Sequence, residues 1–252
     1  AGMGLLAVAL LVLAGGETKA QTNDAFVRAA TLTRLAYVVT GDRATDRVSR
    51  AGLGGLSLYV NRRTAAELGE PVGVDVEKDE LSFFPLLYWP VTEDRGPPSV
   101  EARARVGSYL SGGGTILFDT RGGAVSLFAM ARLSRGLDLP TLVPMPPDHV
   151  LTRSFYLLKE FPGRWTGGEV WIEQAGRRVN DGVATVIAGS NDWAAAWALD
   201  EGERPLFQAV PGGAGQREAA FRFGINLVIY TLTGNYKSDQ IHAPFILRRL
   251  GR

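Results

Sequence analysis

The feature that most constrains the fold is an alternation of short apolar strands with helices, in which polar, glycine-containing loops follow the strands. The clearest example begins at Ser99, a typical helix N-cap residue, with Glu101 in the first turn, where a negative charge suits the helix dipole. Glycines 112–114 end this helix, residues 115–118 form a buried strand, and residues 119–123 form a polar loop that opens another helix. This order is typical of βαβ units, so the sequence predicts an α/β fold: a mainly parallel open sheet with helices on both faces.

The rest of the chain extends this pattern. We predict further strands over residues 35–39, 72–76, 84–89, 168–173 and 183–189, and further helices over residues 51–64, 124–137 and 217–232. The alternation in residues 168–173 suits a strand at the sheet edge. The proline-rich stretch 141–149 predicts a surface loop, and Gly234 is placed to cap the last helix in the left-handed conformation.

The N-terminus indicates membrane attachment or export. Residues 5–13 are a continuous apolar run, and no charged residue occurs in residues 1–16. A spanning helix needs about 20 apolar residues, so the run suits the end of a longer segment or a signal peptide without its basic end. A buried core helix is the third alternative. We predict a transmembrane or signal-like segment with a linker over residues 1–24 and a single α/β domain over residues 25–252.

Composition excludes several function classes. The chain has 27 Lys and Arg against 26 Asp and Glu, a net charge of +1, which argues against nucleic-acid binding. It has no cysteine, so disulfides, thiolate metal sites and a cysteine nucleophile are excluded. The two histidines, His149 and His242, lie too far apart in the sequence to form a metal-ligand motif, and the GxxxxGK[ST], HExxH and GxSxG motifs are missing.

Polar residues cluster at the carboxyl ends of predicted strands, where open parallel sheets bind ligands. Asp119 follows a central strand, and Arg121 could hold a carboxylate or phosphate through its planar guanidinium. The alternative is that Asp119 caps the next helix and pairs with Arg121. Asp42 follows the first strand, and Asn191 and Asp192 follow the last. These three are candidate ligand-binding residues, although a solvated, self-paired loop is the more common role for Asp42 and a closed turn is the more common role for Asn191 and Asp192.

Histidine offers a second route to chemistry. Asp148 and His149 could form a proton-transfer pair, with Arg153 beyond them as a further ligand-binding candidate. The alternative is a hydrogen-bonded structural histidine. Paired with Asp119, His149 would give a hydrolase that acts directly or through Mg²⁺ or Ca²⁺ held by Asp42 and Asp119, because carboxylates suit these cations better than zinc.

Several strings together resemble a known bacterial family. They are residues 35–42 (LAYVVTGD), 84–90 (FPLLYWP), 113–121 (GGTILFDTR), 148–158 (DHVLTRSFYLL), 161–164 (FPGR), 191–194 (NDWA) and 232–240 (LTGNYKSDQ). The combination is similar to the family called domain of unknown function 4159, and the resemblance covers roughly residues 32–252.

The resemblance implies a membrane context and a fold. Family members are often the C-terminal part of a membrane protein whose front end resembles the aerotolerance-regulator N-terminal domain, while others are exported on their own. The implied fold is similar to the class I glutamine amidotransferase-like fold, whose nucleophile follows the strand that here is residues 115–118. This chain has Asp119 at that place and no cysteine, so a cysteine-based mechanism is excluded.

Two functions remain open. The first is a non-catalytic binding or protein-interaction module of a bacterial membrane-associated protein, anchored in the inner membrane with a periplasmic domain. Its expected partners are the membrane and envelope proteins, with no cofactor and no nucleic acid. Trp165, Trp171 and Trp193 could dock a sugar or a protein, although core packing is the alternative. The second is the hydrolase built on Asp119 and His149, with or without Mg²⁺ or Ca²⁺.

Overall fold

The computed structural model describes residues 32–92, 96–122, 126–174 and 183–250. The chain divides into two compact units, Ala1–Thr33 and Arg34–Arg252. The predicted transmembrane or signal-like segment, residues 1–24, lies outside the described residues. Among the helices of the described ranges, none is long and apolar enough to cross a membrane.

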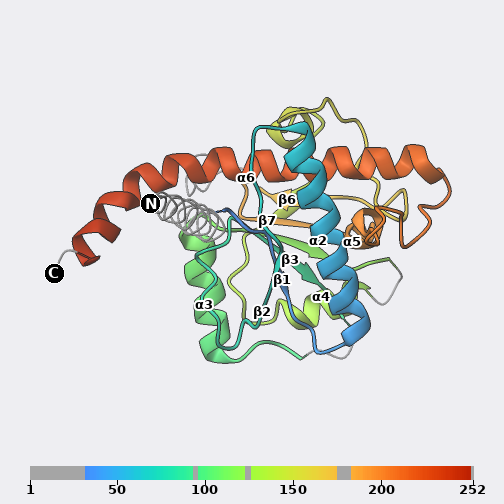
Figure 1. Cartoon of the computed structure of the whole chain (residues 1–252). Coiled ribbons are helices and arrows are strands. Elements are labelled where there is room, and N and C mark those ends of the chain that lie inside the picture. Colours follow the sequence, from blue (N-terminus) through green and yellow to red (C-terminus); the bar gives the residue numbers. More distant parts are fainter. Residues whose placement is uncertain (1–31, 93–95, 123–125, 175–182, 251–252) are drawn as a thin grey trace, which may run out of the picture. The chain divides into compact units, whose positions relative to one another are not determined.

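One sheet organises the second unit (Figure 1). In the described residues it consists of β1 (Ala36–Val38), β2 (Val72–Val74), β3 (Leu86–Pro90), β4 (Thr115–Asp119), β5 (Leu142–Pro144), β6 (Trp171–Glu173) and β7 (Val186–Gly189). The spatial order is β2-β1-β3-β4-β7-β6-β5. Every pair from β2 to β7 in this order is parallel, whereas β6 is antiparallel to both β7 and β5. The prediction of a mainly parallel α/β sheet is confirmed.

Side chains satisfy free backbone N–H groups at the start of several helices. The helices are α2 (Arg43–Arg63), α3 (Val100–Ser111), α4 (Ser126–Leu133), the 3₁₀ helix η1 (Val150–Arg153), α5 (Trp193–Trp197) and α6 (Gly213–Leu250). Asp42 accepts hydrogen bonds from the backbone N–H groups of Ala44 and Thr45, so α2 begins at Arg43, earlier than predicted. Ser99 caps α3 as predicted, through a bond from the N–H of Ala102.

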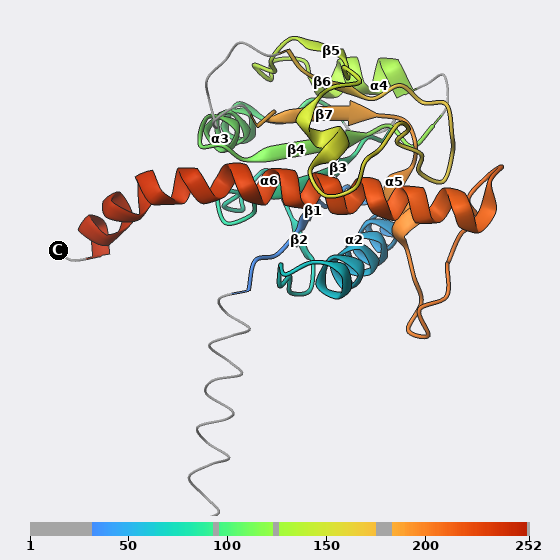
Figure 2. The same cartoon turned by 90° about the horizontal axis from the view of Figure 1, so that it is seen from above.

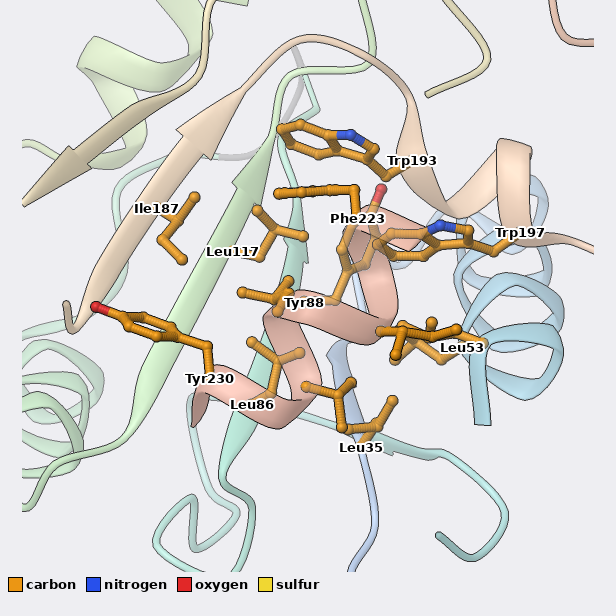
Figure 3. Close-up of a cluster of buried hydrophobic side chains, with 14 of the residues drawn as sticks. Leu35, Leu53, Leu86, Tyr88, Leu117, Ile187, Trp193, Trp197, Phe223 and Tyr230 are labelled. Carbon is orange, nitrogen blue, oxygen red and sulfur yellow. The ribbon is translucent and has the colours of Figure 1, made fainter. Parts of the chain in front are cut away.

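Alternate strand residues point to opposite faces of the sheet, and each face has its own helices (Figure 2). Leu86 and Tyr88 belong to the core beneath α2, α5 and α6, whereas Leu87 and Trp89 belong to the core beneath α3 and α4. Figure 3 shows the first core, in which Leu35, Leu86, Tyr88, Leu117 and Ile187 from the sheet side meet Leu53, Trp193, Trp197, Phe223 and Tyr230 from the helices. Helices therefore cover both faces, as predicted.

Glycines in α2 allow this helix to approach α5 closely. A Cβ atom at Gly52 would lie 2.3 Å from the carbonyl oxygen of Ala194, and one at Gly55 would lie 2.1 Å from that of Trp197. A Cβ at the intervening Gly54 would meet nothing within 4 Å. The close approach of two backbones therefore explains why a 21-residue helix tolerates glycines at Gly52 and Gly55.

Three predicted elements were wrong. The stretch 141–149 was predicted to be a loop, but it contains β5, which pairs with β6 and tolerates Pro144 because it is an edge strand. Because β5 takes the outermost position, β6, which was predicted to be the edge strand, lies inside the sheet. The helix predicted to stop at Gly234 continues as α6 to Leu250, since one helical glycine costs only about 1 kcal/mol.

Candidate functional site

The sheet topology brings together five of the residues that the sequence singled out. Asp119 and Gly189 are paired across β4 and β7, so the residues that follow these two strands are neighbours. The start of α2 joins them, because Nη1 of Arg121 donates to the hydroxyl of Thr45 at 2.8 Å. That hydroxyl in turn donates to Oδ2 of Asp42 at 2.6 Å. One cluster at the carboxyl ends of the parallel strands therefore contains all five residues: Asp42, Asp119, Arg121, Asn191 and Asp192.

Asp119 is fully buried, and both of its carboxyl oxygens accept hydrogen bonds from the protein. Oδ1 accepts from the backbone N–H of Arg121 at 2.9 Å and of Asp192 at 3.2 Å. Oδ2 accepts from the backbone N–H of Trp193 at 2.7 Å and from the hydroxyl of Tyr88 at 3.0 Å. Asp119 therefore caps the start of α5 and ties β4 to the segment after β7. The alternative in which it caps the next helix and pairs with the Arg121 side chain is replaced by this arrangement.

Both buried carboxyl groups of the site have raised pKa values. Burial, followed by the nearby Asp192 carboxylate, raises the pKa of Asp119 to about 7, against the hydrogen bonds that lower it. Burial also raises the pKa of Asp192, and the positive charges of Arg164 and Arg121 oppose this shift. Nη1 of Arg164 lies 3.6 Å from Oδ2 of Asp192. Asp119 therefore keeps its proton at a pH where an exposed aspartate is charged.

Asn191 holds both ends of the loop 161–168 against β7. Its Nδ2 donates to the carbonyl oxygens of Phe161 and Gly168, and its Oδ1 accepts from the N–H of Gly168. A Cβ atom at Gly168 would lie 2.2 Å from this Oδ1, so the close contact requires glycine. Asn191 was predicted to bind a ligand, but its side-chain amide is already hydrogen-bonded to the loop.

Two pockets lie along this loop. The first has a volume of about 520 Å³ and is lined by Arg121, Gly122, Trp165, Thr166, Gly167, Gly168, Ser190 and Asn191. The second, of about 620 Å³, shares residues 166–168 and Asn191 with the first and extends toward Pro144 and Lys159. The first pocket, which we call the Arg121 pocket, lies at the carboxyl ends of β4 and β7.

His149 lies elsewhere. Its Nδ1 accepts a hydrogen bond from the backbone N–H two residues further on, at the start of η1. Its ring lies edge-on to that of Tyr230, 5.6 Å away, and the Tyr230 hydroxyl accepts from the N–H of Ala184. Ala184 precedes Gly189, the β7 partner of Asp119, by about 16 Å of extended chain. His149 thus packs against Tyr230, which bonds near the amino end of β7, while Asp119 lies near the carboxyl end of that strand.

The other candidates from the sequence are Arg153 and three tryptophans, and each of them has different surroundings. Arg153 donates to the carbonyl oxygen of Asp148 and is exposed. Trp193 is fully buried in the core, Trp165 is half-buried in the Arg121 pocket, and Trp171 is 38% exposed. Core packing therefore accounts for Trp193, and the other two tryptophans remain accessible.

The carboxylates proposed for Mg²⁺ or Ca²⁺ are both bonded to the protein. Asp42 accepts from the hydroxyl and N–H of Thr45 and from the N–H of Ala44, and these bonds lower the pKa of Asp42. Asp119 accepts four bonds, as described above. Within the described ranges, no group of three or more His, Cys, Asp or Glu side chains could hold a metal ion.

Three residues that help to form the site were not predicted from the sequence. Thr45, Tyr88 and Arg164 act through partners that lie far away in the chain. Only Thr45 carried a local signal, because it stands three residues after an N-cap aspartate, where the cap accepts its hydrogen bond. Tyr88 and Arg164 required the tertiary structure.

The fold and the site define an α/β domain with a polar pocket at the carboxyl ends of the parallel strands β4 and β7. The chain belongs to the family described as Domain of unknown function (DUF4159), whose model matches residues 34–232. The family resemblance noted in the sequence is therefore confirmed. The membrane context and the likeness to the amidotransferase fold stay predictions. No curated protein matches the chain.

Proposed function

We propose that this domain is a non-catalytic binding module whose ligand occupies the Arg121 pocket. The observation that carries the proposal is the state of Asp119, which follows β4, where the predicted amidotransferase-like fold would have its nucleophile. A nucleophile or general base needs a lone pair that the substrate can reach. Both oxygens of Asp119 accept two hydrogen bonds from the protein, and the residue is fully buried.

The position and size of the Arg121 pocket support ligand binding. Open parallel sheets bind ligands beyond the carboxyl ends of their strands, which is where Arg121 and Ser190 follow β4 and β7. The volume of about 520 Å³ is within the range of about 300–1,000 Å³ that is typical of small-molecule sites. The loop 161–168, held by Asn191, supplies the opposite wall with Trp165.

The hydrolase alternative has less support. General acid–base catalysis requires the two groups to reach one substrate within hydrogen-bond distance or through one water. His149 is bonded into the start of η1 and lies edge-on to Tyr230, away from the cluster around Asp119. We therefore favour the binding module.

A turnover assay tests the absence of catalysis. Wild-type protein, Asp119→Asn and the control Asp138→Asn, at an exposed position, are incubated with ester, amide, phosphomonoester and glycoside substrates. We expect no turnover above background for any of the three proteins. Turnover by wild type and Asp138→Asn that disappears in a folded Asp119→Asn variant would overturn the proposal.

We also propose that the domain belongs to a membrane-associated protein of the bacterial inner membrane, with the domain in the periplasm and envelope proteins as partners. The apolar run of residues 5–13 supports this proposal, and so does the membrane context that the family resemblance implies. The near-neutral charge of +1 argues against nucleic acid as a partner. Protease treatment of spheroplasts tests the topology: digestion of the domain without lysis is expected, and protection until lysis would contradict it.

A further inference from the structure

We infer that the Arg121 pocket binds an oxyanion, namely a phosphate or carboxylate group of the ligand, with Arg121 as its cationic partner. This inference rests on the proposed function, because it assigns a ligand class to the same pocket. It comes from the charge of the lining, from the unpaired donors in it, and from the way the protein holds Arg121.

The lining of the pocket carries positive charge without a compensating carboxylate. Its residues include Arg121 and no Asp or Glu. The buried carboxylate of Asp192, on which the charge of Arg121 also acts, has its ion pair with Arg164 at 3.6 Å. Among the described residues Arg121 makes no ion pair, and its Nη1 bonds to the neutral hydroxyl of Thr45. The guanidinium is therefore available to an anion.

Several hydrogen-bond donors around the pocket lack acceptors. Nε of Arg121 is buried without a hydrogen-bond partner in the part of the chain that the structure describes. Buried donors are nearly always paired, so an unpaired guanidinium N–H points to a ligand or an ordered water. Nε1 of Trp165 and the hydroxyls of Thr166 and Ser190 make no hydrogen bond with a described residue either; unlike Nε of Arg121 they are open to solvent, and all three residues line the pocket. One cation with neutral donors around it suits an oxyanion, which accepts several hydrogen bonds.

The backbone at Arg121 is held in a conformation that favours this role. Arg121 has φ +56° and Gly122 has φ +86°, and a left-handed conformation is costly for a residue with a side chain. The bond from the N–H of Arg121 to Asp119 stabilises this turn. A Cβ atom at Gly122 would lie 3.1 Å from the indole of Trp165, so glycine lets the indole lie close to the backbone at Gly122.

The guanidinium is fixed from the other side by α2. Thr45 is buried, and its hydroxyl lies between Oδ2 of Asp42 and Nη1 of Arg121. Asp42 is itself fixed as the N-cap of α2. Asp42 and Thr45 therefore act as positioning residues, and a pre-oriented guanidinium loses less freedom when the anion binds.

The test is a titration of the full chain followed by the ¹H–¹⁵N signals of the five tryptophan indoles. Sodium phosphate, sodium acetate and sodium chloride are compared at equal ionic strength, and Trp165→Phe assigns the Trp165 signal. We expect phosphate or acetate, but not chloride, to shift this signal saturably. Arg121→Gln should weaken binding by about tenfold or more, because a charged hydrogen bond is lost. Arg132→Gln, with the same charge change at an exposed position on α4, should bind as wild type does.

The outcomes separate the sources of the anion. Saturation with phosphate alone assigns a phosphate-bearing ligand, and saturation with acetate alone assigns a carboxylate. No saturable shift with either, or equal affinity in Arg121→Gln, overturns the inference. If Arg121→Gln does not fold, Ser190→Ala removes one neutral donor, and unchanged phosphate and acetate affinity in that variant overturns the inference instead. The binding-module proposal is judged separately by the turnover assay.

Discussion

Replacing Asp119 by asparagine tests the buried hydrogen bonds at the centre of the site. The side-chain volume is nearly unchanged, but an NH₂ group cannot accept a hydrogen bond, whereas each carboxyl oxygen of Asp119 can, even when one of them carries the proton. If the NH₂ group takes the place of Oδ2, it can donate to the Tyr88 hydroxyl but faces the N–H of Trp193, which lies 2.7 Å from Oδ2. The opposite orientation is worse, because the NH₂ then faces the two N–H groups of Arg121 and Asp192.

The expected cost follows from the better orientation. A buried donor left without an acceptor costs about 1–3 kcal/mol, and the same bond is the cap of α5, for which about 1 kcal/mol is typical. These overlap, so we expect Asp119→Asn to lower the free energy of unfolding by about 2–3 kcal/mol. For a chain of this length that corresponds to a fall in Tm of about 5–10 °C.

Urea unfolding at pH 5, followed by tryptophan fluorescence, measures this difference. Asp138→Asn is the matched control, and its free energy of unfolding should stay within about 0.5 kcal/mol of wild type because the residue is exposed. Equal stability of Asp119→Asn and wild type at pH 5 would refute the hydrogen-bond reasoning.

The pH dependence provides a second, independent check. Because the pKa of Asp119 is raised to about 7, the folded protein keeps a proton that the unfolded chain loses above about pH 4. The wild-type free energy of unfolding therefore falls as pH rises through this window, by at most about 1.4 kcal/mol per pH unit from this group, and levels off above pH 7. Asp119→Asn lacks this contribution, so its deficit should narrow from pH 5 to pH 8. If the stability deficit of Asp119→Asn instead widens from pH 5 to pH 8, the pKa of Asp119 is lowered by folding, not raised.

The remaining predictions concern the packing of α2 and α6. Gly55→Ala should lower the free energy of unfolding by about 2 kcal/mol or more, because its Cβ would meet the carbonyl oxygen of Trp197 at 2.1 Å. Gly54→Ala, where a Cβ meets nothing within 4 Å, should instead raise it by about 0.5–1 kcal/mol, and a loss in both variants would contradict the packing argument. Asn226→Leu should cost about 2–4 kcal/mol, since Asn226 is fully buried and satisfies both the N–H and the carbonyl of Tyr156. Thermal unfolding measures all three, and an Asn226→Leu variant as stable as wild type would show that water replaces these bonds.

Elements with strong local signals were predicted correctly. The five parallel strands each contain a short apolar run followed by a turn, and the start of α3 is signalled by Ser99. A local pattern suffices in these regions, because burial on both faces demands apolar residues and a helix start demands a capping acceptor. The start of α2 shows the limit: Asp42 was noted as a site candidate, and its capping role was overlooked.

Elements that depend on distant partners were not predicted. β5 is a strand because β6 offers it hydrogen bonds, and its prolines alone suggest a loop. The short α5 begins where Asp119, far away in the sequence, accepts the N–H of Trp193. Gly234 has the local signature of a helix end, but α6 continues past it.

The sequence by itself determined the α/β class, the parallel strands, the family and the position of a polar cluster at strand ends. These follow from hydrophobic periodicity and from turn and capping chemistry, which act over a few residues. Only the tertiary structure decided how the cluster is used. Asp119 is buried and caps α5, Nε of Arg121 is buried without a partner among the described residues, and His149 is bonded into the start of η1. The reason is physical: whether a carboxyl or a guanidinium is satisfied depends on which donors and acceptors the fold brings within 3 Å of it, and those come from residues scattered along the chain.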